Sequence, residues 1–279
     1  MGRLRGAETA KELTKRARDI AVSLMRPPKL VIIRFGADSS DISYENGAKK
    51  RMEKCAIDCE SRVYPAETEP EIFFSEFEAL NSDDSVDGIL VLQPLPKKIS
   101  AARLFSVLDP AKDMDCASPE NRLKLFEGRE TVYPCTPEAV IRMMDQAGID
   151  LQGKHAVVIG RSMVVGKPLA MMLLERNATV TVCHSRTKDL PSVCREADVL
   201  ITAIGRAKMI DGTYVKEGAA VFDVGINMDS EGNLCGDCDP ESMPHASLVT
   251  PVPGGVGSVT TSVLALHVAQ AAAAKLPRR

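Results

Sequence analysis

The length and composition of the chain are those of an ordinary globular protein. It has 279 residues, of which 44% are hydrophobic and 26% charged, a balance that excludes a disordered or fibrous chain. At roughly 100–200 residues per domain, this length predicts one large domain or two of medium size. The net charge of −3 gives no general attraction to nucleic acid or to an anionic membrane, so we expect neither as a partner.

The cysteines and the apolar runs indicate where such a chain resides. No apolar run reaches the roughly 18–20 residues that span a bilayer, and the charged start of the sequence is unlike a signal peptide. The eight cysteines are scattered, which favours free thiols in a reducing cytoplasm. Cys235 and Cys238 have the spacing of a redox pair, but a second pair for zinc is missing, so we expect no metal site.

The first half of the chain alternates predicted helices and strands. Apolar residues recur at helical spacing over residues 7–25, and two prolines end that helix. We expect buried strands at Lys29–Gly36 and Val86–Leu92, and a helix at Asp41–Asp58. Because strands separated by helices usually pair in parallel, this half predicts an α/β unit.

The alternation restarts after a helix that could link two units. Thr136 as N-cap and Pro137 at the first helical position predict its start, and it runs to about Ala147. The elements that follow are predicted as strands at His155–Ile159, Thr179–Cys183, Val199–Ile204 and Ala219–Val224, and as helices at Lys167–Arg176, Leu190–Ala197 and Thr260–Ala274.

A glycine loop joins the first strand of the second half to its helix. Gly160 and Gly166 bracket this loop, although their spacing is not the usual G-x-G-x-x-G. Such a loop brings backbone N–H groups and a helix N-terminus close to a pyrophosphate, so we expect a dinucleotide here. Arg161 and Ser162 are candidate cofactor-binding residues, with simple capping of the loop as the alternative.

The residues after the second strand bear on the choice of cofactor. An NAD-specific protein usually places an acidic residue there, where this chain has His184, Ser185 and Arg186. A cation and hydroxyls suit a 2′-phosphate, so NADP is favoured over NAD. The alternative is that Arg186 is a solvated turn residue.

Further glycine turns follow the later strands of the second half. In a doubly wound sheet, ligands bind beyond the carboxyl ends of the strands. We therefore expect Gly205 and Ile226 to contact the cofactor, and the segment Pro251–Gly257 to approach a ligand and to lead into a helix.

Taken together and in order, these motifs resemble the methylenetetrahydrofolate dehydrogenase/methenyltetrahydrofolate cyclohydrolase family. The matching segments are Gly160–Pro168, Asp223–Gly225 and Thr250–Gly257 in the second half, and Lys29–Gly36, Pro110–Asp115 and Tyr133–Pro137 in the first. The resemblance covers nearly the whole chain.

The resemblance implies an α/β protein of two domains. An N-terminal folate domain would span residues 1–139 and be completed by a C-terminal helix within 260–279. A Rossmann-like, doubly wound domain over residues 140–259 would bind NAD(P). The resemblance also implies a cytoplasmic homodimer and a tetrahydrofolate derivative as the substrate.

The resemblance also assigns roles to individual residues. Tyr44 is similar to the family tyrosine that stacks on the folate, and Asp115 to the acid that accepts hydrogen bonds from the pterin ring. A core tyrosine and a turn carboxylate are the respective alternatives, and Cys116 stands where the family usually has glycine. The other expected substrate contacts are Gln93, Pro253, Gly254 and Gly255.

The chain departs from the bifunctional members of this family in two places. In those members a lysine follows the tyrosine by four residues; here that position holds Ala48, and Lys49 comes next. One residue turns a helix by about 100°, so Lys49 should leave from another face unless a slip or bulge corrects it. The glutamine that would contact the lysine is replaced by Leu92, and Gln93 should point to the opposite side of its strand.

The two departures predict a dehydrogenase whose cyclohydrolase activity is lost. Hydride transfer needs no general base, whereas ring opening by water requires proton transfers. An intact bifunctional enzyme that uses Lys49 or a bound water remains an alternative. So does a non-catalytic folate- or nucleotide-binding relative, against which the intact glycine loops argue. An NAD(P) oxidoreductase for another small molecule is less consistent with Tyr44 and Asp115 together.

Overall fold

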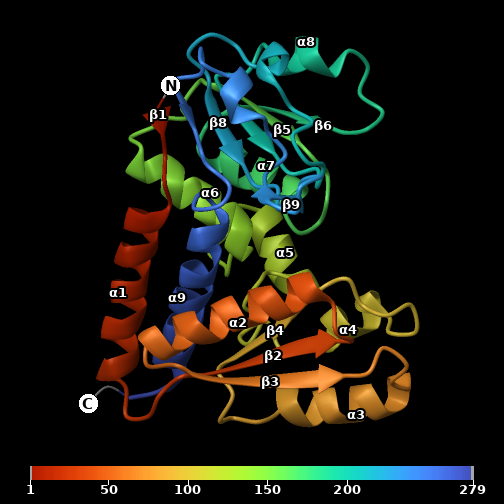
Figure 1. Cartoon of the computed structure of the whole chain (residues 1–279). Coiled ribbons are helices and arrows are strands. Elements are labelled where there is room, and N and C mark those ends of the chain that lie inside the picture. The colour runs from red at the N-terminus through yellow and green to blue at the C-terminus, as the bar shows by residue number, and fades with distance from the viewer. Residues whose placement is uncertain (1, 278–279) are drawn as a thin grey trace. The chain divides into compact units, whose positions relative to one another are not determined.

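The computed structural model describes residues 2–277, which pack as two compact units (Figure 1). Unit 1 comprises the residues before Lys11, residues 125–129 and residues 134–260. Unit 2 comprises Lys11–Lys124, Glu130–Tyr133 and the residues from Thr261 onward. Each unit is therefore assembled from segments that are distant in the sequence.

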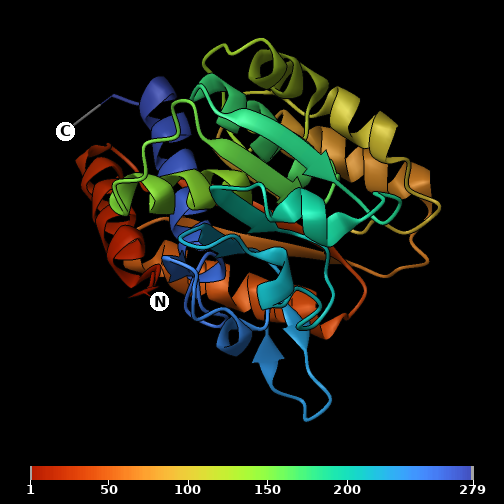
Figure 2. The same cartoon turned by 90° about the horizontal axis from the view of Figure 1, so that it is seen from above.

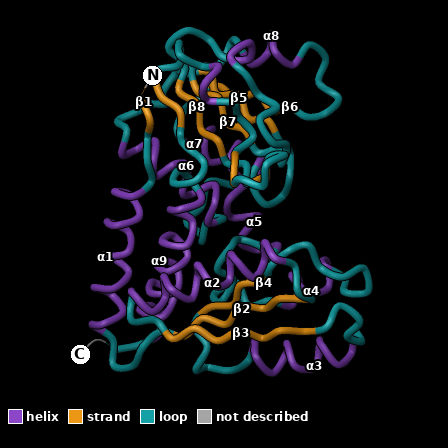
Figure 3. Tube along the Cα trace, in the orientation of Figure 1, coloured by secondary structure: helices purple, strands orange, loops and turns teal. Residues whose placement is uncertain are grey.

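Unit 1 is built on a six-stranded parallel sheet, drawn in orange in the upper part of Figure 3. Its order is β1-β11-β8-β7-β5-β6. The strands are β1 (Gly2–Arg3), β5 (His155–Ile159), β6 (Thr179–Cys183), β7 (Val199–Thr202), β8 (Ala220–Asp223) and β11 (Leu248–Val249). Counted along the chain from β5, five of these strands have the doubly wound order 2-1-3-4-5, and β1 adds an outer strand beside β11.

The central strands of unit 1 are buried, which explains their sequences. Every residue of β7 and β8 is buried, as is β5 after His155. A parallel sheet covered by helices on both faces requires such continuous apolar strands. The helices of this unit are α6 (Cys135–Gln146), α7 (Gly166–Glu175) and α8 (Leu190–Cys194).

A two-stranded antiparallel hairpin accompanies the sheet of unit 1. It consists of β9 (Asn227–Met228) and β10 (Leu234–Cys235), and it follows the loop after β8. Figure 2 shows this hairpin, in light blue, as an arm that projects from its unit. The short 3₁₀ segments Gly212–Tyr214 and Pro240–Ser242 lie on either side of it in the sequence.

Unit 2 is built on a three-stranded parallel sheet of order β3-β2-β4. The strands are β2 (Lys29–Phe35), β3 (Asp58–Tyr64) and β4 (Gly88–Val91). The helices are α1 (Ala7–Ser23), α2 (Ser39–Lys54), α3 (Pro70–Asn81), α4 (Ala101–Val107), α5 (Pro119–Phe126) and α9 (Gly257–Lys275). Of these helices, α1, α5 and α9 each also extend into unit 1. Phe73, Phe74 and Phe77 of α3 fill the core against Phe35 and Tyr64. The aromatic residues of this chain are few, and most of them gather here.

The structure corrects two predicted element bounds. Helix α2 ends at Lys54, not at Asp58, because Ala56 adopts a φ of 57° and Asp58 already belongs to β3. Thr136 is not an N-cap: α6 begins at Cys135 after Pro134, whose carbonyl accepts the first helical hydrogen bond, from Glu138 N–H. Pro137 lies in the first turn, where its missing N–H costs no helical bond.

The residues that make up the two units differ in places from those of the predicted domains. Residues before Lys11 and residues 134–139 pack with the second half of the chain. The predicted domains, 1–139 with 260–279 and 140–259, concern ligand binding, so their bounds remain a prediction. No helix within residues 2–277 has the length and apolar character needed to cross a membrane.

Candidate cofactor and folate sites

The loops after β5 and β7 form the switch point of the sheet in unit 1. β5 and β7 are parallel neighbours; β6, which follows β5 in the chain, is added on one side of β5, and β7 with the strands that follow it on the other. Doubly wound sheets bind ligands at such a reversal of strand order. Gly160 follows β5 with a φ of 133°, and a Cβ there would collide with the carbonyl oxygen of Ala203, which follows β7. Only glycine permits this close approach, so the predicted residue Gly160 has a defined geometric role.

The start of α7 fits a pyrophosphate. Gly166 begins the helix and packs against the carbonyl of Gly160, and within the described chain no side chain caps the first turn. Arg161 and Ser162 are exposed in the loop, and Ser162 Oγ accepts the N–H of Val165 at 3.1 Å. An open helix N-terminus beside an arginine and a hydroxyl suits an anionic ligand.

The turn after β6 fits a phosphorylated ribose. His184 N–H donates to Thr187 Oγ1 at 2.9 Å, and Thr187 N–H donates to the His184 carbonyl at 2.8 Å. These bonds close the turn and leave Ser185 and Arg186 exposed at its tip. The arginine is thus placed where a 2′-phosphate would be bound in a doubly wound fold.

A cavity of about 270 Å³ lies where the loops after β8 and β11 meet. It brings together four predicted residues: Ile226, Pro253, Gly254 and Gly255. Ile226 is 63% exposed, so its side chain is accessible at the wall of this cavity. The loop is held from the N-terminal segment, because Gly6 N–H donates to the Gly254 carbonyl at 2.9 Å.

Buried acids organise the base of this cavity. Asp223, the last residue of β8, is 3% exposed and accepts the N–H groups of Gly225, Asp237 and Cys238 at 2.8–3.0 Å. Burial raises the pKa of Asp223 above its ordinary value, although the backbone N–H groups act in the opposite direction. Asp237 itself is fully buried, and sequence reasoning did not single it out.

In unit 2 the predicted folate residues follow the carboxyl ends of strands. Gln93 is exposed just after β4. Asp113, two residues before Asp115, forms a parallel bridge with Ile89 of β4. Tyr44 is half-buried in the second turn of α2. These positions are compatible with one surface, although their roles in binding remain predictions.

Asp113 fixes the turn that carries Asp115. Asp113 is 1% exposed, and its carboxylate accepts the N–H groups of Ala117 and Ser118 at 2.9 and 2.8 Å. It also accepts Asn121 Nδ2 at 3.0 Å. Asp113 thus holds the turn, while Asp115 remains partly exposed.

Lys49 belongs to a charged cluster between α2 and the strands β2 and β3. Its Nζ lies 2.7 Å from Glu45 Oε1, and Glu45 also accepts Arg34 Nε and Ser61 Oγ at 2.7 Å each. Burial raises the pKa of Glu45, but the hydrogen bonds from Lys49, Ser61 and Arg34 outweigh it and bring that pKa to about 2.

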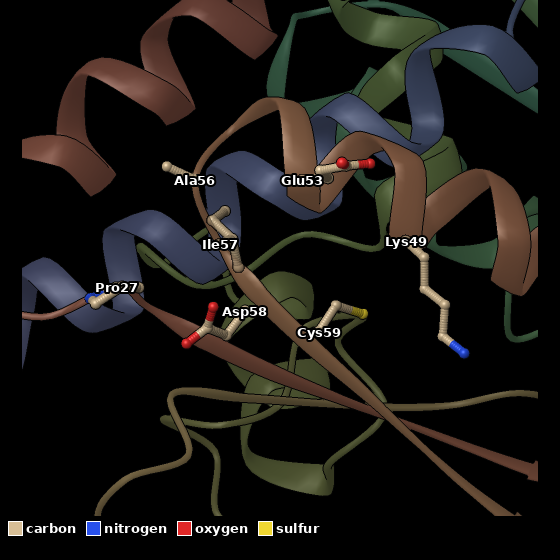
Figure 4. A pocket seen from close by; sticks show the side chains of 7 residues that line it. All are labelled: Pro27, Lys49, Glu53, Ala56, Ile57, Asp58 and Cys59. Carbon is tan, nitrogen blue, oxygen red and sulfur yellow. The ribbon is translucent and has the colours of Figure 1, made fainter.

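Figure 4 shows Lys49 extending from α2 toward β3, beside Cys59. Both residues line an open hollow of about 470 Å³ with Asp58 and Glu53. Burial raises the pKa of the Cys59 thiol to about 11, so it is protonated and unreactive at neutral pH. The cluster therefore joins α2 to β2 and β3 and offers no reactive thiolate.

The cysteines form neither a disulfide nor a metal site in the described chain. All eight are free thiols, and residues 2–277 contain no group of three or more His, Cys, Asp or Glu side chains able to hold a metal ion. Cys235 ends the hairpin strand β10, and Asp237 and Cys238 follow it.

Two family models match the chain. One, described as the tetrahydrofolate dehydrogenase/cyclohydrolase catalytic domain, covers residues 4–115. The other, described as the NAD(P)-binding domain of the same enzymes, covers residues 134–276.

Known proteins are similar over nearly the full length. A curated relative named bifunctional protein FolD, from Clostridioides difficile (strain 630), is 49% identical over 94% of this chain and 92% of its own. The crystal structure of a bifunctional FolD from Campylobacter jejuni has a TM-score of 0.94 at 36% identity, covering 98% of each chain. A Trypanosoma brucei FolD complexed with NADP and an inhibitor has a TM-score of 0.91 at 32% identity, covering 98% of this chain and 97% of its own. These matches confirm the predicted two-domain α/β fold with an NAD(P)-binding domain.

Proposed function

Since the chain belongs to the tetrahydrofolate dehydrogenase/cyclohydrolase family and is an NAD(P)-binding oxidoreductase, we propose that it is a methylenetetrahydrofolate dehydrogenase with little or no cyclohydrolase activity. It oxidises 5,10-methylenetetrahydrofolate to 5,10-methenyltetrahydrofolate and leaves ring opening to another catalyst. The observation that carries this proposal is the pair of side chains at positions 48 and 49.

The oxidation asks for positioning rather than proton transfer. Bound NAD(P) supplies the hydride acceptor. The glycine loops at Gly160 and Gly205 let the backbone approach the cofactor, and the cavity wall at Ile226 and Pro253–Gly255 excludes water beside it. Holding two reacting carbons about 3–3.5 Å apart is worth roughly 7–11 kcal/mol, which is the contribution that these loops are expected to make.

The folate is held by residues of unit 2 in this proposal. Tyr44 offers an aromatic face, Asp115 a carboxylate that accepts from the donor edge of a pterin, and Gln93 an exposed amide. None of these residues has to exchange a proton with the methylene group. The chain therefore retains what the hydride transfer requires.

At position 48 the chain has no side chain that could transfer a proton during hydrolysis. Ala48 follows Tyr44 by one helical turn on the same face of α2, and it is fully buried. A methyl group can neither donate nor accept a proton, so the ~10²–10⁴-fold that a positioned lysine typically contributes is missing. Leu92, half-buried at the end of β4, likewise cannot hydrogen-bond such a lysine through its side chain.

Lys49 is badly placed to substitute. Its ammonium is paired with buried Glu45, whose carboxylate also accepts a hydrogen bond from Ser61 Oγ of β3. Gln93 and the segment around Asp115 lie on the β4 side of the sheet. Because the strand order is β3-β2-β4, these are opposite edges. This supports the loss of cyclohydrolase activity over its rescue by Lys49.

An intact bifunctional enzyme is the second candidate function, since the relatives above are named bifunctional. One absorbance time course on methylenetetrahydrofolate with NADP or NAD separates the two candidates. We expect reduced cofactor and methenyl product to rise together, with the methenyl compound decaying no faster than in an enzyme-free control. Reduced cofactor without methenyl accumulation would establish hydrolysis instead.

A pair of variants tests the two positions directly. Ala48→Lys with Leu92→Gln should raise methenyl hydrolysis at least about 10-fold, because a proton donor and its partner return. Ala48→Met with Leu92→Gln is the matched control, of similar length but without a titratable group. Equal hydrolysis by the two folded variants would contradict this interpretation of Ala48.

The cofactor preference follows from the turn after β6. Ser185 and Arg186 favour NADP, so Arg186→Ala should weaken NADP binding about 10-fold and leave NAD binding within 2-fold, as expected for loss of one charge-assisted contact. Titration of the two cofactors by calorimetry measures both. An equal loss for NAD and NADP would place Arg186 elsewhere than at the 2′-phosphate.

A homodimer in a reducing cytoplasm completes the proposal. The free cysteines support the compartment, and the net charge of −3 gives no reason to expect nucleic acid as a partner. Light scattering on the purified chain tests the dimer: a mass twice that of one chain is expected.

A further inference from the structure

We propose that Asp237 is a positioning residue for the cofactor, which it serves by fixing the loop after β7 without touching the ligand. This inference rests on the proposed function, because it assumes that the switch point between β5 and β7 binds NAD(P). It concerns a residue within the segment Cys235–Cys238, whose sequence alone showed only the spacing of a redox pair.

The carboxylate of Asp237 accepts hydrogen bonds from the loop on both sides of Gly205. Asp237 Oδ2 accepts Ile204 N–H at 2.7 Å, and Oδ1 accepts Arg206 N–H at 2.8 Å. Both backbone N–H groups therefore turn inward to a side chain with no exposed surface. Gly205, between them, is exposed and presents its backbone to the switch point.

The same carboxylate also ties this loop to the hairpin. Asn227 Nδ2, at the start of β9, donates to Asp237 Oδ1 at 3.0 Å. Asn227 directly follows Ile226, which lines the cavity with Pro253–Gly255. Asp237 thus couples the β7 loop to one wall of that cavity.

Asp237 is itself held in place by its neighbours. Its own N–H donates to Asp223 Oδ1 at 3.0 Å, and Asp223 also contacts Thr202 Oγ1, at the end of β7, at 3.2 Å. Gly225 lacks the Cβ that would collide with the Asp237 carboxylate. Asp237 therefore joins the ends of β7 and β8 through a defined path of hydrogen bonds.

The chemistry of these bonds explains why an aspartate is required. Within the described chain, the donors that reach the Asp237 carboxylate are uncharged N–H groups, three in number and divided between two oxygens. An asparagine would offer one oxygen and turn an NH₂ group against at least one of these donors. The loop would then lose a bond and meet an opposed donor at the same point.

The test is the Asp237→Asn variant, with Asp239→Asn as its matched control two residues away. We expect the Kd of NADPH, measured by its fluorescence without folate, to rise at least 10-fold in Asp237→Asn and less than 2-fold in Asp239→Asn. The KM for the folate should change less than 2-fold. A folded Asp237→Asn protein that binds NADPH within 2-fold of the wild type would overturn the proposal.

A second measurement distinguishes positioning from general stability. In the ligand-free protein, amide hydrogen exchange at Ile204 and Arg206 should speed up at least 10-fold in Asp237→Asn, while exchange in β5 stays unchanged. If Asp237→Asn does not fold, the test uses Asn227→Ala, which removes one donor and keeps the carboxylate. A 2–3-fold weaker affinity for NADPH would support the positioning role of Asp237, and an unchanged affinity would refute it. Failure of the wild type to bind either NADPH or NADH would instead refute the proposed function.

Discussion

Two buried carboxylates, Glu45 in unit 2 and Asp223 in unit 1, are stabilised in opposite ways. They are 6% and 3% exposed, so burial penalises the charge of both. The cations Arg34 and Lys49 hold the pKa of Glu45 at about 2, whereas Asp223, which accepts mainly backbone N–H groups, has a raised pKa. Ion pairs therefore stabilise the α2–β3 region, whereas backbone hydrogen bonds and close backbone packing stabilise the cofactor edge.

The largest effect is expected where backbone fit is disturbed. Gly225→Ala places a Cβ 2.7 Å from the backbone nitrogen of Asp237, closer than real Cβ contacts come, and against its carboxylate as well. Because the backbone can shift only at a cost in packing, we expect the free energy of unfolding to fall by about 3 kcal/mol and cofactor binding to weaken. Urea titration followed by circular dichroism measures the stability. A stable variant with unchanged NADPH affinity would show that the edge tolerates misfit.

A smaller effect is expected where charge is removed. Glu45→Gln leaves Arg34 buried without its carboxylate, so stability at pH 7 should fall by about 2 kcal/mol. Because the folded pKa of about 2 lies below the ordinary value of 4.5, this contribution is complete above pH 4.5 and is lost as the pH falls toward 2. The gap between wild type and variant should therefore close over that interval in urea titrations.

Glu53→Gln provides the control for this charge effect. Glu53 lies on the same helix but is exposed, so the same chemical change should cost less than about 0.5 kcal/mol. Equal losses for both variants, or a gap that persists unchanged at pH 2, would remove the distinction between the two regions.

The smallest effect has the opposite sign. Gly47 is exposed in α2, and a Cβ there would have nothing within 4 Å. Gly47→Ala should therefore raise stability by about 0.5–1 kcal/mol, because alanine loses less backbone freedom in a helix. Thermal melting measures this gain. A destabilised variant would mean that fit matters on α2 as it does at Gly225.

Much of the fold was predictable where burial is continuous. Strand β5 begins and ends at the predicted residues, because a short apolar run between turn residues leaves few other interpretations. Strand β6 also has its predicted bounds, although only Cys183 of its five residues is buried. Strand β3 was not predicted: Asp58–Tyr64 is an edge strand with few buried residues and carries no apolar run. Strand β1 has two residues, and only its partner β11, far away in the sequence, makes it a strand.

Some residues of the site could likewise be predicted from local sequence patterns, and others could not. Gly160, Gly166 and Gly205 lie in loops that the strand–loop–helix pattern locates, since such loops are local in sequence. Asp237 could not be found so, because its partners Ile204 and Arg206 are about thirty residues away and contribute only backbone N–H groups, which no side-chain pattern records. An acid between two small or apolar neighbours just after a hairpin was the one available signal.

The pairing of β1 with β11 has a consequence for how the chain folds during its synthesis. Gly2 aligns with Leu248, so the outermost strand of the cofactor sheet is made first and its partner is made near the end. Until β11 leaves the ribosome, the first strand has no neighbour to accept its backbone hydrogen bonds, and the contact order of unit 1 is correspondingly high. The sheet of unit 2 lies wholly between Lys29 and Val91 and can form earlier. Unit 2 also contains most of α9, so neither unit is complete until the helix Gly257–Lys275 has been translated.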